Sequence, residues 1–151
     1  VSLVRRANCV VKASLGKNIF LAPAIKACGY IPNTANEELL QKSIDALKSG
    51  ESLIIFPEGT RTAGEIVFHK AAAYIAVNAA KQLVAVAIKM DPSSLKKNEP
   101  WYKTPSVMIK YEFKELFRLN LDGFCADRPN PIRARGLHAF ISENYTKEFK
   151  Q

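Results

Sequence analysis

The sequence has no apolar run that approaches the roughly 20 residues needed by a membrane-spanning helix. It also contains no internal repeat and no low-complexity segment. What is present is the composition of an ordinary globular protein, with 48% hydrophobic and 24% charged residues. At 151 residues the chain is long enough to bury a sizeable core, and one domain is the expectation.

Cysteine and histidine are both scarce. The three cysteines, Cys9, Cys28 and Cys125, are an odd number and lack the spacing of metal ligands. We expect reduced cysteines in a cytosolic compartment rather than disulfides. The sequence predicts no metal site, and it contains only two histidines, His69 and His138.

Negative charge is in the minority, and the formal net charge is +8. Residues 1–95 and 96–151 each carry 11 Lys and Arg against 7 Asp and Glu, so no basic tail stands out. An evenly basic domain suits an anionic partner, such as an acidic lipid surface, a phosphorylated substrate, an acyl carrier or coenzyme A. Simple solubility is the alternative explanation. No signature of a nucleic-acid module is present, so the sequence predicts no nucleic-acid partner.

The apolar pattern predicts strands and helices in alternation. Strands are expected over residues 8–13, 30–31, 53–56, 83–89, 106–113 and 116–121. Helices are expected over residues 15–28, 70–81 and 132–150, and between a capping box at Thr34 and Glu37 and a stop at Gly50. This alternation predicts an α/β fold with a mostly parallel sheet flanked by helices.

Two of the expected strands are apolar without alternation, at residues 53–56 and 83–88. Strands of a parallel sheet that is covered on both faces have this pattern. We therefore expect both to be buried strands of one sheet. Residues 106–113 alternate instead, which predicts a strand with one solvated face near a sheet edge.

A polar segment leaves the first of these strands. It reads Phe56-Pro57-Glu58-Gly59-Thr60-Arg61. In open α/β sheets, ligands bind outside the carboxyl ends of the strands. Arg61 offers a planar fork of donors suited to phosphate or carboxylate, and Gly59 lets the backbone approach a ligand closely. An ordinary surface turn, with Arg61 in a structural ion pair, is the alternative.

This signature segment, residues 56–61, resembles the third conserved block of the phospholipid/glycerol acyltransferases of the lysophosphatidic acid acyltransferase type. Residues 8–12 and 29–33 resemble the second block and the segment leading to it, and residues 83–88 resemble the fourth. The resemblance covers roughly residues 8 to 112, and the C-terminal part is generic. It implies an α/β fold with the conserved blocks clustered on one side.

Members of that family carry a first block, His-x-x-x-x-Asp, whose His is the general base and whose Asp orients it. Neither His69 nor His138 is followed by Asp at that spacing. We therefore expect residues 1–151 to be the C-terminal portion of an acyltransferase domain in a longer chain. No catalytic residue is then assigned within these residues, and this portion alone is expected to be inactive. The resemblance implies no metal, no cofactor and no covalent enzyme intermediate.

The implied reaction moves a fatty acyl group from acyl-CoA or acyl carrier protein to a hydroxyl of a lysophospholipid-type acceptor. The third block of the family helps to bind the acceptor, so the predicted phosphate-binding residues are Glu58, Gly59, Thr60 and Arg61. The second block supplies a predicted site edge at Ile31, Pro32 and Asn33.

The second block departs from the family pattern, because Asn33 and Thr34 stand where many members have an Arg. The acceptor is therefore not necessarily a simple glycerol phosphate. Two alternatives stay open. One is an acyltransferase for a carrier-bound or polyene-type product, and the other is a non-catalytic module that binds a phosphoryl ligand.

The loop before the last strands contains the only Trp. Lysines and aromatic residues meet there, at Lys96, Lys97, Trp101 and Tyr102. Such a mixture suits a membrane interface, so we expect peripheral contact there. The expected location is the cytoplasmic face of a membrane, with the protein either peripheral or anchored by a segment that precedes these residues. The alternative is a loop that buries Trp101 against the domain. The same loop resembles one in a bacterial branch of the family, found beside pigment and unusual-fatty-acid synthesis clusters.

Overall fold

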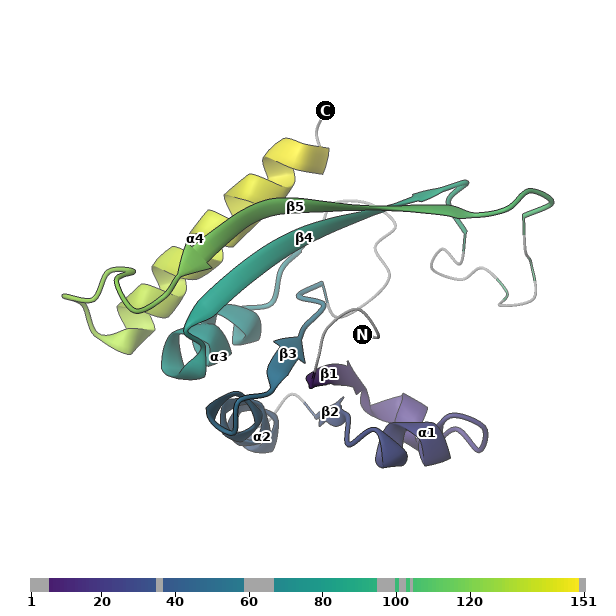
Figure 1. Cartoon of the computed structure of the whole chain (residues 1–151), viewed down its shortest axis with the longest axis horizontal. Helices are drawn as coiled ribbons and strands as arrows, with labels where there is room; N and C mark the ends of the chain where they lie inside the picture. Colours follow the sequence, from purple (N-terminus) through teal and green to yellow (C-terminus); the bar gives the residue numbers. More distant parts are fainter. Residues whose placement is uncertain are drawn as a thin grey trace.

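The computed structural model describes residues 6–34, 37–58, 67–94, 100, 103 and 105–149. A small parallel sheet with its helices lies on one side of the molecule, and a long antiparallel ribbon with helix α4 lies along the other (Figure 1). In chain order the elements are β1 (Ala7–Lys12), a 3-10 turn η1 (Ala13–Lys17), α1 (Ala22–Ala27), β2 (Ile31–Asn33), α2 (Glu37–Lys48), β3 (Ser52–Ile54), α3 (Ala71–Ala79), β4 (Gln82–Asp91), β5 (Lys110–Asn120) and α4 (Asn130–Phe149).

The parallel sheet has the strand order β2-β1-β3. Val10 of β1 pairs with Ile31 of β2, and Ala7 pairs with Ser52 of β3, both in parallel register. Helices connect the strands, because parallel neighbours need a crossover. The predicted α/β class, with a parallel sheet flanked by helices, is confirmed.

The helix expected over residues 15–28 is in fact two short helical pieces, η1 and α1. Asn18 separates them, because its side-chain oxygen accepts hydrogen bonds from the backbone N–H groups of Phe20 at 2.9 Å and Leu21 at 3.2 Å. An Asn side chain competes with the helical backbone in this way. Pro23 lies in the first turn of α1, where its missing N–H is harmless.

The prediction that residues 53–56 and 83–88 share one buried sheet is wrong. β3 ends at Ile54, and Phe56 is 59% exposed. β4 belongs to a separate ribbon, and its side chains alternate, with Ala85 and Ala87 buried but Val86 exposed. Buried alanines alternate here with larger, exposed apolar residues, so all positions are apolar and the alternation between the two faces of the strand does not show in the hydropathy pattern.

Two strands are expected over residues 106–113 and 116–121, but the structure has one strand, β5, which starts at Lys110, after residues 106–109, and pairs antiparallel with β4. Ala85 pairs with Phe117 and Val86 with Glu115, which leaves Leu116 as the extra residue of a bulge. A bulge lets a strand bend without ending. The charged residues around position 115 therefore lie inside the strand and do not separate two strands.

The main core lies where α3, α4 and the base of the ribbon meet. Its buried members are apolar and mostly small: Ala73, Ala76, Val77, Leu121, Ala134, Leu137 and Ile141. The alanines let α3 approach α4 closely, and α3 also contacts α2. Among the described residues, no helix combines the length and the apolar character needed to cross a bilayer.

Ion pairs fasten the end of α4 to both strands of the ribbon. Glu148 accepts from the Nζ atom of Lys114 at 2.7 Å and from that of Lys89 at 3.0 Å. The hydrogen bonds from Lys114 and then Lys89 hold the pKa of Glu148 below its ordinary value. The position of α4 relative to β4 is thereby fixed at this end of the helix.

Candidate functional site

The carboxyl ends of the parallel strands point to the same edge of the sheet. β2 ends at Asn33, opposite Lys12 of β1, whereas β3 ends at Ile54, opposite Cys9. The two strand ends are therefore offset by about 10 Å along β1. Residues 55–57, when extended, span about that length. The start of the signature segment thus leaves the edge of the sheet at which ligands bind in this fold class.

The predicted site residues are only partly described. Ile31 is buried, Pro32 half-buried and Asn33 exposed, so the predicted site edge runs from the core to the surface. Glu58 is half-buried in a turn at residues 57–58, which begins three residues after the last residue of β3. The remaining predicted acceptor-binding residues, Gly59, Thr60 and Arg61, lie outside the described residues, as do Lys96, Lys97, Trp101 and Tyr102.

A cleft between residues 58–61 and 29–32 stays a prediction. The described part of the chain brings only Glu58 and the residues around it to this edge of the sheet.

A backbone hydrogen bond joins the start of the signature segment to His69, which lies eight residues beyond its end. The N–H of His69 donates to the carbonyl oxygen of Pro57 at 2.8 Å. The chain at residue 69, just before α3 begins, therefore lies beside residue 57. His69 itself is exposed, as expected for a residue at a helix entry, and its backbone amide makes the closing contact.

Helix α4 contacts the same place from the other side. Nε2 of His138 lies 3.0 Å from the carbonyl oxygen of Phe68, and the ring of Tyr145 lies 5.1 Å from the ring of Phe68. The hydroxyl of Tyr145 donates to the carbonyl oxygen of Val86 on β4 at 2.9 Å. The sequence pattern missed both contacts, because no spacing links residues 138 and 145 to residue 68.

Burial and neighbouring groups shift the pKa of Tyr145. Burial raises the pKa of Tyr145, the hydrogen bond to Val86 opposes that rise, and the negative charge of Glu58 adds to it. Tyr145 of α4 thus contacts Phe68 directly and is subject to the negative charge of Glu58.

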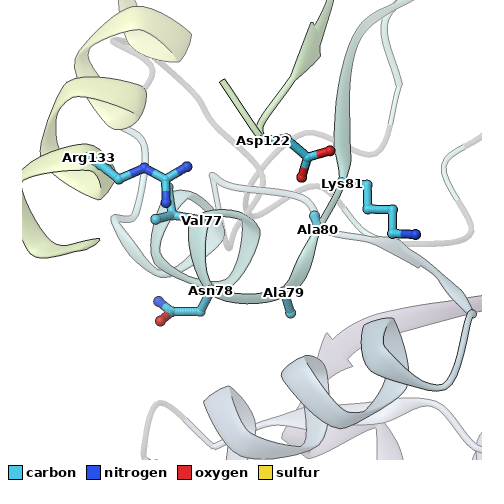
Figure 2. Close-up of a pocket in the computed structure, with 7 residues that line it drawn as sticks. All are labelled: Val77, Asn78, Ala79, Ala80, Lys81, Asp122 and Arg133. Atoms are coloured by element: carbon cyan, nitrogen blue, oxygen red, sulfur yellow. The ribbon is translucent and has the colours of Figure 1, made fainter. Parts of the chain in front are cut away.

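A concave region lies at the C-terminal end of α3 (Figure 2). It has a volume of about 310 Å³ and is lined by Val77, Asn78, Ala79, Ala80, Lys81, Asp122 and Arg133. Arg133 is already engaged there: Nε donates to the oxygen of Phe124 at 2.9 Å, Nη2 to that of Leu121 at 2.7 Å, and Nη1 to Oδ1 of Asn130 at 3.1 Å. The guanidinium braces a turn, and no lining residue belongs to the signature segment.

The comparisons with known proteins agree with the sequence resemblance. A family model described as Acyltransferase matches residues 2–89, which run from β1 into β4 and include the signature segment. No curated protein and no solved structure matches the chain significantly. The family match spans more than half of the 151 residues, with the signature segment beyond a parallel strand as the fold requires. The chain belongs to the acyltransferase family of glycerolipid acyltransferases.

Proposed function

We propose that the protein transfers a fatty acyl group from acyl-CoA or acyl carrier protein to a hydroxyl of a lysophospholipid-type acceptor. Membership of the acyltransferase family supports acyl transfer in general. The observation that carries the finer proposal is the position of Glu58, half-buried just beyond β3, at the start of the segment that contains Arg61. A planar guanidinium recognises a phosphate monoester through two parallel hydrogen bonds.

The proposed reaction is a direct exchange of ester for thioester. The acceptor oxygen attacks the thioester carbonyl carbon, a C–O bond forms, and the C–S bond breaks. The hydroxyl proton passes to a general base and then to the departing thiolate, so charge and atoms balance. The family resemblance implies that the base is the His of a His-x-x-x-x-Asp block, which these 151 residues do not contain. The residues on this chain bind and orient the acceptor.

The experiment is a thiol-release assay with acyl-CoA and an N-terminally extended form of the protein that carries such a block. We expect release to depend on lysophosphatidate and to be at least tenfold slower with the monoacylglycerol that lacks only the phosphate. Equal use of both would favour a carrier-bound or polyene-type acceptor. Phosphate-ligand binding without any release would favour a non-catalytic binding module.

We propose further that the protein works at the cytoplasmic face of a membrane, with Lys96, Lys97, Trp101 and Tyr102 as the contact residues. Two exposed apolar side chains just before β5 support this: Val107 is 62% exposed and Met108 is 87% exposed, so both could contact a lipid surface. The net charge of +8 favours an anionic surface.

Replacing Lys96, Lys97 and Trp101 together by Ala should weaken binding to phosphatidylserine-containing vesicles by about 30-fold at low salt, since each lysine near such a surface contributes about 1 kcal/mol. Added salt should reduce the difference by screening. Co-sedimentation with vesicles measures the partition.

The matched control for this test is Lys26→Ala with Lys48→Ala and Tyr74→Ala, which removes the same charge and one aromatic from exposed positions elsewhere. An equal loss in both triple variants would show that net charge alone drives binding, and would overturn this contact site.

A further inference from the structure

Helix α4 lies wholly outside the matched residues 2–89, yet it contacts the chain on the flank of the signature segment. Helix α4 packs on α3 and on the ribbon, and it also contacts the backbone carbonyl oxygen of Phe68, just before α3 begins. That additional contact involves the peptide group that closes the segment.

The peptide group between Phe68 and His69 is bonded at both of its ends. Its carbonyl oxygen, from Phe68, lies 3.0 Å from Nε2 of His138, and its N–H, from His69, donates to Pro57 at 2.8 Å. Because a carbonyl oxygen only accepts, Nε2 must carry the proton and donate. The planar peptide therefore connects α4 directly to the residue before Glu58, and bonds in such a chain polarise one another.

Tyr145 lies on the same face of α4, two turns after His138, and makes a second set of contacts. Its ring packs against Phe68, with centroids 5.1 Å apart, and its hydroxyl holds the backbone of β4 at Val86. Val86 lies within residues 83–88, the stretch that resembles the fourth conserved block. One side chain of α4 thus joins the flank of the third block to the fourth.

We infer that His138 and Tyr145 are positioning residues, which hold residues 57, 68 and 69 together so that Glu58 keeps its place for the acceptor. This inference rests on the proposed function for its effect on the acceptor. Its physical core, the closure of residues 57 and 69 by α4, is independent of that function.

The direct test is amide hydrogen exchange at His69, measured by NMR on the 151-residue chain. His138→Ala removes the donor to Phe68, and a hydrogen bond of about 1 kcal/mol predicts exchange about fivefold faster at His69. His138→Gln keeps a side-chain N–H donor and should restore slow exchange. Tyr145→Phe, which keeps the ring, should disturb exchange less than Tyr145→Leu.

The functional test uses the N-terminally extended form. His138→Ala should raise KM for lysophosphatidate about fivefold while KM for acyl-CoA stays unchanged. The control is Phe140→Ala, because Phe140 packs edge-on against Phe117 of β5 with centroids 4.9 Å apart and belongs to the same helix. This control should lower the denaturation midpoint without changing exchange at His69 or the ratio of the two KM values.

The outcomes separate the two ideas. Unchanged exchange at His69 in His138→Ala and Tyr145→Leu, measured under native conditions, would overturn the positioning role. Faster exchange with both KM values unchanged would overturn its link to the acceptor. Faster exchange in a protein that transfers no acyl group to any acceptor would support the closure by α4 and count against the proposed function alone.

Discussion

The 151-residue chain on its own is expected to release thiol from acyl-CoA about 10²–10⁴-fold more slowly than a form that also carries a His-x-x-x-x-Asp block. A neutral hydroxyl is a weak nucleophile, and it needs a base within hydrogen-bond reach while it attacks the thioester. Positioned base catalysis accounts for a factor of this size. The prediction depends on whether any group in the chain can replace that base.

Within the part of the chain that the structure describes, neither histidine has the carboxylate partner of a catalytic base. His138 is already bound through Nε2 to the carbonyl oxygen of Phe68, and it lies on α4, where Ile141 one turn later is buried. His69 is exposed and is followed by Lys70 and then alanines, so no carboxylate within the next helical turn can orient its ring. Glu58 is a carboxylate, which is a much weaker base than an imidazole.

A thiol-release assay on the chain and on the extended form, at equal concentration and with the same acceptor, measures the difference. Far-UV circular dichroism and a urea midpoint establish that the shorter chain is folded. Replacing the His of the added block by Ala should reduce the extended form to the level of the chain alone. Comparable turnover by both forms would overturn the missing-base argument and would require another general base among these residues.

Local sequence patterns predicted the parallel part of the fold well. β1 and α2 arise from short apolar patterns whose partners are near in the chain, and α3 follows from its alanines. The apolar run at residues 83–88 did not disclose its partner, because pairing with β5 depends on residues 110–120, well downstream. The hydropathy period of a strand can be found in its own residues, whereas the identity of the strand it pairs with depends on residues elsewhere in the chain.

The site shows the same division. The sequence placed Glu58 beyond a strand, and the structure has it there. The contact between His138 and Phe68 joins residues 70 positions apart, and it uses a backbone carbonyl, which carries no side-chain signal in the sequence. The sequence predicted a helix over residues 132–150, but not that the hydroxyl of Tyr145 reaches Val86.

Arg61→Ala in the extended form is expected to lower kcat/KM for lysophosphatidate by about 10- to 100-fold. A charge-assisted pair of hydrogen bonds to a phosphate contributes roughly 1.5–3 kcal/mol, which corresponds to that range. KM for the acyl donor should change less than twofold, since the proposed contact is with the acceptor alone. Arg61→Lys keeps the charge and loses the fork, so it should fall between wild type and Arg61→Ala.

A matched control separates recognition from charge. Arg118→Ala removes the same charge from an exposed position on β5, where the guanidinium pairs with Glu115 at 2.8 Å. It should leave both substrates unaffected at physiological salt, because a pair on the surface contributes little.

The acceptor without a phosphate supplies the decisive comparison. If Arg61 binds the phosphate, monoacylglycerol already lacks the contact, so Arg61→Ala should leave its slow rate unchanged. The two losses, of the guanidinium and of the phosphate, should then fail to add, as expected for groups that interact directly. Additive losses would place Arg61 away from the phosphate. Equal losses for donor and acceptor, or none at all, would point to a structural ion pair and leave the acceptor to be recognised elsewhere on the protein.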